Sequence, residues 1–327
     1  RGVKFKFFHR ALALEADATG LIRSVKVGIQ ATPSNGEYMP LVDVNGLPCW
    51  PSAPRYEQLA EEEALRMAYG SRRCDIEFAH TQWQDQATVT LTQGSDFDQV
   101  ILGVSAAAIP GLFCGGSAHA DALVARAKKS ETVATQSMQT WTAQDLAQMG
   151  WNLPQPVVTN YAKPFDTWAD LSNLIAHEGW PGDSSPTGAQ YFCGVLDDKL
   201  LRRVGDSGTP AQLEHDQIAA ANGLRWAHSH LGFLWPAYAG PLTQKGLPDP
   251  LNHRALWFSA NTDPSSRYVL STSGSIVHRF EPAQSGFTNM MVVGDWLKTG
   301  LDYGCVEGAV ISGFKAARHL LGGEWPI

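Results

Sequence analysis

The sequence is short of three things: cysteines at ligand spacing, positive charge and long apolar runs. Its five cysteines, at positions 49, 74, 114, 193 and 305, are odd in number and form no CxxC or Cys/His pattern, which argues against a disulfide framework and against a zinc site. His228 and His230 stand two residues apart, which is not the i, i+4 spacing of helical metal ligands. We therefore expect reduced thiols, a cytoplasmic protein and no bound metal.

The charge and the apolar runs exclude two further classes of protein. The net charge is −7 at pH 7 and no cluster of Lys and Arg is present, which excludes nucleic acid as a partner. The longest apolar stretch, Val100 to Gly116, is shorter than the about 20 residues of a membrane span and contains Pro110. The sequence starts with Arg1 and lacks the charged and apolar regions of a signal peptide, so we interpret its start as internal.

What the sequence does contain is a strand, a glycine-rich turn and a helix within the stretch from Met291 to Leu321. The apolar run 290–293 predicts a buried strand whose tip carries Asp295. From Val306 onward, apolar or small residues recur at helical spacing until the glycine pair 322–323 ends the helix. The first N–H groups of such a helix lack partners within it, so they favour an electron-rich carbonyl or a developing negative charge in front of them.

The segment GDWLKTG followed by GCVEGAVISG resembles the carboxy-terminal motif of the FAD-dependent amine oxidase superfamily, most closely its phytoene desaturase and squalene-forming dehydroxylase branch. The resemblance implies FAD as the cofactor. In that family the acid after the first glycine, here Asp295, bonds the ribityl chain. The amides at the helix start, here near Val306 and Glu307, face the pyrimidine side of the isoalloxazine. The alternative is a strand and helix without a ligand, but this order of glycines is more specific than a lone glycine pair.

The resemblance implies eight cofactor-binding positions: Gly294, Asp295, Trp296, Gly304, Cys305, Val306, Glu307 and, by order along the chain, Ala11. The catalytic residues stay unknown, with Tyr303, Cys305 and Trp296 as candidates that line the flavin. Amine-oxidising members have an aromatic residue just before the helix start, where this sequence has Cys305, and this departure counts against an amine substrate. Gly308 and Gly313 are expected to let the helix lie close to the flavin or to a strand.

We expect an α/β fold of mixed α+β character, which combines part of a glutathione-reductase-like FAD-binding domain with a helical or mixed substrate domain. Residues 1–29, 81–117 and 261–327 are assigned to the FAD-binding domain, and residues 30–80 and 118–260 to the substrate domain. Alternating apolar residues predict a hairpin before residue 30 and a strand at 87–92, and the run from 97 onward is expected to re-enter the same sheet. Tryptophans spread through 141–257 line an apolar pocket or, more simply, fill a core.

One expected part of an FAD-binding domain is missing. Such a domain needs an amino-terminal βαβ unit with a G-x-G-x-x-G turn, and the glycines at 111, 115 and 116 spell GLFCGG, which does not match. We expect a second polypeptide, or the amino-terminal product of a longer precursor, to supply that unit in a heteromeric protein.

The sequence therefore predicts a subunit, or a processed carboxy-terminal chain, of an FAD-dependent oxidoreductase, either an oxidase or a dehydrogenase. It would accept a hydride from a small organic substrate: an amine, an amino acid, or an apolar ring or isoprenoid compound. Two alternatives remain, a non-catalytic subunit that completes a flavoprotein partner and an FAD-dependent isomerase or dehydroxylase without net redox chemistry.

Overall fold

A computed structural model describes residues 2–51, 53–70, 76, 81–113, 115–178, 180, 185–201, 211–238 and 256–322. Cys74, Cys114 and Gly323 lie outside these residues. The chain forms two compact units: unit 1 comprises residues 1–38, 56–133 and 263–327, and unit 2 comprises residues 39–55 and 134–262. Both units combine helices with open sheets, so the expected mixed α/β class is confirmed.

These units divide the chain differently from the expected domains. Residues 30–38, 56–80 and 118–133, which we assigned to the substrate domain, belong to unit 1, and residues 261–262, which we assigned to the FAD-binding domain, belong to unit 2. Residues 118–133 belong to unit 1 because helix α3 (Ala118–Ala127) buries Leu123 in the core of that unit. The change of composition near residue 118 marks the start of a helix. The roles of the two domains stay a prediction.

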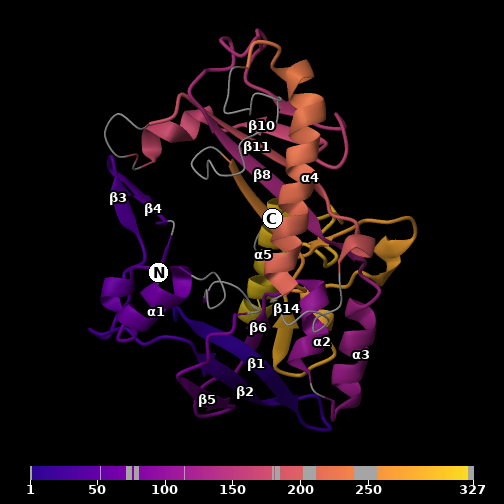
Figure 1. Ribbon diagram of the computed structural model, residues 1–327. Coiled ribbons are helices and arrows are strands. Elements are labelled where there is room, and N and C mark those ends of the chain that lie inside the picture. Colours follow the sequence, from indigo (N-terminus) through magenta and orange to yellow (C-terminus); the bar gives the residue numbers. More distant parts are fainter. Residues whose placement is uncertain are drawn as a thin grey trace. The chain divides into compact units, whose positions relative to one another are not determined.

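Unit 1 contains an antiparallel sheet in the order β1-β2-β5, formed by β1 (His9–Ala16), β2 (Ile22–Ile29) and β5 (Ala87–Thr92) (Figure 1). The expected hairpin is confirmed. Its turn is held by Asp17, whose carboxylate accepts the N–H groups of Thr19 at 2.8 Å and Leu21 at 3.1 Å. The hydroxyl of Thr19 and these N–H groups hold the pKa of Asp17 well below its usual range.

A second, parallel sheet of unit 1 pairs β6 (Val100–Leu102) with β14 (Met290–Val292). Helix α5 (Val306–Leu321) follows β14 and ends at Gly322, whose φ is +61°. The expected strand and helix are thus confirmed. The expectation that residues 97 onward re-enter the sheet of the hairpin is wrong, because β6 pairs with β14 and not with β5.

The side chain of Asn289 joins the two sheets. Its Oδ1 accepts the N–H of Ile22 at 2.8 Å, its Nδ2 donates to the carbonyl of Ile22 at 3.1 Å, and its own carbonyl accepts the N–H of Val100 at 2.9 Å. Asn289 is buried, with 3% of its surface exposed. One amide side chain therefore replaces the backbone pairing that a continuous sheet would have.

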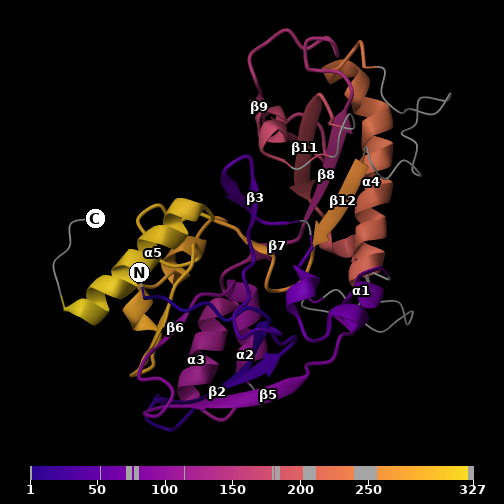
Figure 2. The ribbon, with the colours of Figure 1, turned by 90° about the vertical axis from the view of Figure 1, so that its left-hand side faces the viewer.

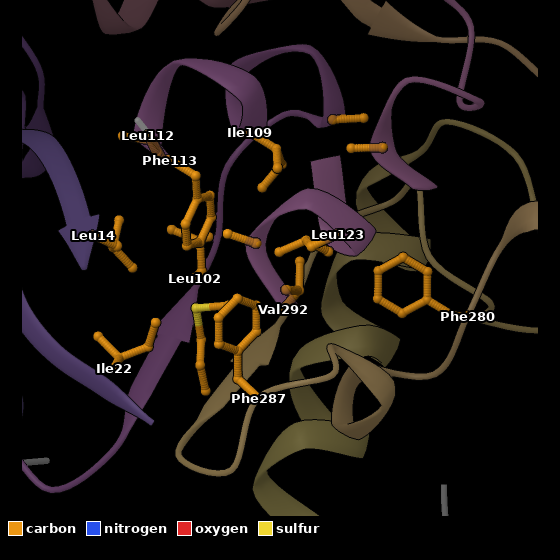
Figure 3. Packing of buried hydrophobic residues seen from close by; sticks show 14 of the residues in the cluster. Leu14, Ile22, Leu102, Ile109, Leu112, Phe113, Leu123, Phe280, Phe287 and Val292 are labelled. Atoms are coloured by element: carbon orange, nitrogen blue, oxygen red, sulfur yellow. The ribbon is translucent and has the colours of Figure 1, made fainter. Parts of the chain in front are cut away.

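The core of unit 1 lies where the hairpin, the parallel strands and the short helices meet. Leu14 and Ile22 of the hairpin approach side chains from β6, from α2 (Ile109–Leu112) and from the segment before β14 (Figure 3). Helix α2 packs against β1 and α3 (Figure 2). The labelled residues of this core are Leu14, Ile22, Leu102, Ile109, Leu112, Phe113, Leu123, Phe280, Phe287 and Val292. The remaining elements of unit 1 are η1 (Tyr56–Gln58), α1 (Glu62–Gly70), η2 (Ala106–Ala108), β7 (Thr132–Val133), β13 (Tyr268–Val269), η6 (Ser275–His278) and η7 (Pro282–Gln284).

Unit 2 is built on a five-stranded antiparallel sheet in the order β12-β8-β11-β10-β9, with the long helix α4 (Ala211–Leu234) packed against β8 and β12 (Figure 1). The strands are β8 (Thr135–Thr142), β9 (Val157–Val158), β10 (Thr167–Asp170), β11 (Gly188–Val195) and β12 (Leu256–Asn261), and the unit also contains β3 (Val42–Val44), β4 (Leu47–Cys49), η3 (Ser172–His177) and η5 (Asp198–Leu200). Of the expected alternatives, a helical or a mixed domain, the described residues of unit 2 form a mixed one.

The tryptophans of unit 2 divide between the core and the surface. Trp168, Trp226 and Trp235 expose at most 2% of their surface and pack around Phe192. Trp257 on β12 is 43% exposed. The simpler interpretation, that these side chains fill a core, holds for the three buried residues.

Candidate functional site

A cavity of about 450 Å³ in unit 1 lies directly beyond the carboxyl ends of β6 and β14. Ligands of parallel α/β sheets commonly bind at this edge. Its lining comes from the segments after both strands, from β13 and from the start of α5: Gly103, Val104, Ser105, Ala106, Arg267, Tyr268, Val269, Val293, Gly294, Asp295, Trp296, Cys305, Val306 and Ala309.

Gly294 makes the sharp exit from β14. Its φ is +150°, and a Cβ built on it would lie 2.8 Å from the indole of Trp296. Its N–H donates to Oγ of Ser312 at 2.8 Å, and Ser312 is fully buried on the inner face of α5. Both the backbone angle and the contact require a glycine here, and the bond to Ser312 fixes the strand tip against the helix.

Asp295 carries the carboxylate of the cavity. Burial raises its pKa, whereas the guanidinium of Arg279 and the N–H groups of Asp295 and Cys305 act in the opposite direction. The N–H of Cys305 that acts on this carboxylate belongs to the residue just before α5. The strand tip and the helix start therefore present their polar groups to the same space.

Helix α5 begins at Cys305, whose Sγ accepts the N–H of Gly308 at 3.2 Å and whose carbonyl accepts the N–H of Ala309 at 3.2 Å. Within the described part of the chain, the N–H groups of Val306 and Glu307 donate to no acceptor. These two groups and the helix dipole make the start of α5 electropositive.

The two glycines of α5 behave differently. A Cβ at Gly308 would lie 3.3 Å from Sγ of Cys305 and 3.7 Å from Cα of Asp295, so the expected close approach to the strand tip is confirmed. A Cβ at Gly313 would meet no described atom within 4 Å, so the expected approach to a strand is wrong for Gly313, while an approach to the flavin stays a prediction.

The predicted site residues reach the cavity to different degrees. Five of the eight predicted cofactor-binding residues line it: Gly294, Asp295, Trp296, Cys305 and Val306. Gly304 lies beside it, because a Cβ there would come within 3.1 Å of the carbonyl of Val269. The side chain of Glu307 is exposed and lies outside the lining, as does Ala11 on β1. Their roles toward FAD stay predictions.

Two of the three catalytic candidates offer little to a ligand through their side chains. Trp296 is 1% exposed, donates its Nε1–H to the carbonyl of Val104 at 3.0 Å and meets Phe280 edge to face, so its ring belongs to the core. Tyr303 is 51% exposed and lies outside the lining. Cys305 alone of the three combines partial exposure with a place in the cavity.

Sequence reasoning missed the arginines around this cavity. Arg267 lines it and bonds Thr132 through Nε and Nη2, both at 3.2 Å. Arg279 is 7% exposed and bonds the strand tip. Arg267 and Arg279 are isolated cations in a segment without clear periodicity. The only sequence feature that could have pointed to them is their position shortly before the glycine-rich motif that starts at Gly294.

The described residues contain no group of three or more His, Cys, Asp or Glu side chains that could hold a metal ion. Among the same residues, no helix combines the length and the apolarity that crossing a membrane requires.

Comparisons with known proteins give no family. No protein-family model matches the sequence, and no curated protein matches it. Among solved structures, the chain is similar to the crystal structure of an oxidoreductase from Methanosarcina mazei, with 11% sequence identity and a TM-score of 0.49. The alignment covers 95% of this chain and 49% of the other, so the chain spans about half the length of that oxidoreductase. A likeness of this degree carries no argument about what the chain does.

Proposed function

We propose that this chain is part of an FAD-dependent oxidoreductase and that its cavity in unit 1 holds the flavin end of the cofactor. When bound, FAD supplies the acceptor for a hydride from a small organic substrate. The observation that carries the proposal is the convergence of Asp295 and the amino terminus of α5 on one cavity. A carboxylate accepts hydrogen bonds from the hydroxyls of a ribityl chain, and the helix start stabilises negative charge.

The shape of the cavity supports a ligand of this kind. Its volume of about 450 Å³ lies in the range of small-molecule sites, and most of its lining is apolar or small. Gly294 and Gly304 bring bare backbone to its edge, where an extended polar chain can approach closely.

For the substrate we favour a neutral apolar compound, such as a ring or isoprenoid compound, over an amine or an amino acid. Among the described residues, Asp295 is the only carboxylate in the lining, and we assign it to the cofactor. Arg267, the only guanidinium among the same lining residues, is bonded to Thr132. The lining thus offers little to recognise a charged substrate.

We also propose that a second polypeptide carries the strand and helix that complete this site. In the described part of the chain, the parallel sheet has only the strands β6 and β14, and parallel sheets are normally larger and covered on both faces. All three residues of β14 are buried, whereas Ile101 in the middle of β6 is 50% exposed. The exposed side chain of Ile101 marks a face of the sheet that no described element covers. Within the described residues, each of the two strands also has an edge without a strand partner, where an added strand could pair.

The outer face of α5 supports the same partner. The helix packs inward through the small buried residues Gly308, Ser312 and Ala316. Its outward side carries an apolar stripe in which Val310 is 49%, Phe314 60% and Leu321 71% exposed. These residues recur at intervals of four and seven, which suits the packing of another helix. A strand followed by a helix could cover a free edge of the parallel sheet and this stripe.

A visible spectrum of the native assembly tests the proposed function. Flavin absorption that an added substrate bleaches under anaerobic conditions supports an oxidoreductase. Absorption that no substrate bleaches favours the non-catalytic alternative, and turnover without any electron acceptor favours an isomerase or dehydroxylase. A colourless assembly defeats the proposal.

Denaturing electrophoresis with mass spectrometry tests the partner. We expect a second polypeptide with a G-x-G-x-x-G turn after a strand, and this chain expressed alone should be insoluble or free of flavin. A single soluble, monomeric species of 35.5 kDa loaded with FAD would refute this part of the proposal. A cytoplasmic location remains a proposal that rests on cysteine usage.

A further inference from the structure

We infer that Arg279 is the positioning residue of the cavity in unit 1: it holds the connection between β14 and α5 so that Asp295 and the start of α5 face the same space. The inference rests on the proposed function for its consequence, the binding of flavin. Its structural part, the fixing of residues 294–305, stands on the contacts of Arg279 alone.

The guanidinium of Arg279 is buried and directed at the strand tip. Its Nη1 donates to the carbonyl of Asp295 at 2.6 Å and to that of Leu297 at 3.2 Å. Its Nη2 donates to Oγ of Ser271 at 3.2 Å. Because the chain turns after Gly294, these two carbonyls have left the parallel strand pairing, and a charged donor satisfies both.

The contact continues to the far end of the connection. Oγ of Ser271 donates to the carbonyl of Asp302 at 2.8 Å. Asp302, with a φ of +58°, accepts the N–H groups of Thr299 at 3.0 Å and Gly300 at 3.3 Å through Oδ1. Arg279 and Ser271 together therefore join the beginning of the connection to its last turn, three residues before Cys305.

The charge of Arg279 acts on the same site. Burial lowers the pKa of Arg279, while Asp302, Asp295 and Cys305, the groups that face it, oppose this shift. Among the described residues, the hydrogen bonds of Arg279 go to carbonyl and hydroxyl oxygens and not to the carboxylate of Asp295, which lines the cavity. The effect of the hydrogen bonds of Arg279 can be separated from the effect of its charge by experiment, because lysine keeps the positive charge but lacks the planar guanidinium that bonds two groups at once.

The experiment compares Arg279→Lys and Arg279→Met with the wild type in the native assembly. Arg10→Met serves as the control, because Arg10 forms an ion pair with Asp85 beside the antiparallel sheet of unit 1. The first measurement is amide hydrogen exchange over residues 294–305, with β5 as the internal reference. The second is the dissociation constant for added FAD after removal of bound flavin.

We expect Arg279→Met to speed exchange over residues 294–305 by roughly tenfold to a hundredfold, and to weaken FAD binding by a similar factor, since hydrogen bonds to a charged group are lost. Arg279→Lys should give faster exchange than the wild type and an intermediate dissociation constant. Arg10→Met should leave both quantities within about twofold, because its position lies outside the connection.

Exchange over residues 294–305 that stays within about twofold of wild type in both Arg279 variants overturns the inference. If Arg279→Met also loses protection in β5, it has unfolded, and Arg279→Lys alone decides. If the wild-type assembly binds no FAD, the proposed function fails, while the exchange measurement still decides whether Arg279 fixes the connection.

Discussion

Replacing Asp295 by asparagine should weaken flavin binding and at the same time stabilise the chain. Burial raises the pKa of this carboxyl, so the folded chain holds a proton that the unfolded chain releases. The free energy of unfolding therefore falls as the pH rises from the ordinary pKa range of aspartate through the raised pKa, and at neutral pH the ionised carboxylate destabilises the chain. Asparagine removes this destabilising charge but keeps an oxygen that can accept the N–H of Cys305.

The loss of flavin affinity follows from the hydrogen bond that the carboxylate would accept. A hydrogen bond to a charged group contributes on the order of 1.5 to 3 kcal/mol, so the dissociation constant for FAD should rise roughly tenfold to a hundredfold. The melting temperature of the flavin-free assembly should rise at pH 7, and the gain should vanish at acidic pH, where the carboxyl of the wild type is protonated.

Flavin titration and thermal melting over a pH series measure both effects. Asp98→Asn is the matched control, because it removes the same charge from an exposed residue just before β6. Full flavin affinity in the asparagine variant would refute the assigned role of Asp295 in flavin binding. Melting of the variant below the wild type at pH 7 would refute the destabilising effect of the buried charge.

Three further predictions concern packing. Gly308→Leu should release flavin, because even a Cβ there lies 3.3 Å from Sγ of Cys305. Gly313→Ala, in contrast, should raise the free energy of unfolding by up to about 1 kcal/mol. Flavin content and urea denaturation distinguish the two variants, and equal behaviour of both would contradict the geometry. Asn289→Ala should cost about 2 to 5 kcal/mol by leaving two buried backbone groups of Ile22 unpaired, and a loss below about 0.5 kcal/mol in urea denaturation would show that water replaces the amide. Phe314→Glu should reduce co-purification of the second polypeptide, because it places a charge in the exposed stripe of α5; undiminished co-purification would place the partner elsewhere.

Local patterns were sufficient for the parts of unit 1 nearest the cavity. The hairpin follows from alternating residues around an aspartate turn, and α5 follows from helical spacing closed by Gly322. Both signals lie within about thirty residues of sequence, which is the range over which periodicity is informative. Gly294 could be foreseen as the end of a strand, although its contact with Trp296 could not.

The sheet of unit 2 was hidden because its strands bury polar residues beside apolar ones. On β8, Gln136, Thr140 and Thr142 are buried on the same face as Met138, while Trp141 points to the other face. An alternation of apolar and polar residues therefore runs against the actual burial, and the binary pattern fails. Arg279 was missed for another reason, since its acceptors lie 16 and 18 residues away and only the fold brings them together.

Asn289 gives the hairpin and the parallel strand a common register. Its amide engages both the N–H and the carbonyl of Ile22 while its backbone pairs with Val100. A slip of one residue would turn this side chain to the opposite face and break both bonds. The amide of Asn289 therefore helps to fix the position of the hairpin, which carries Ala11, relative to β14, which leads to Gly294.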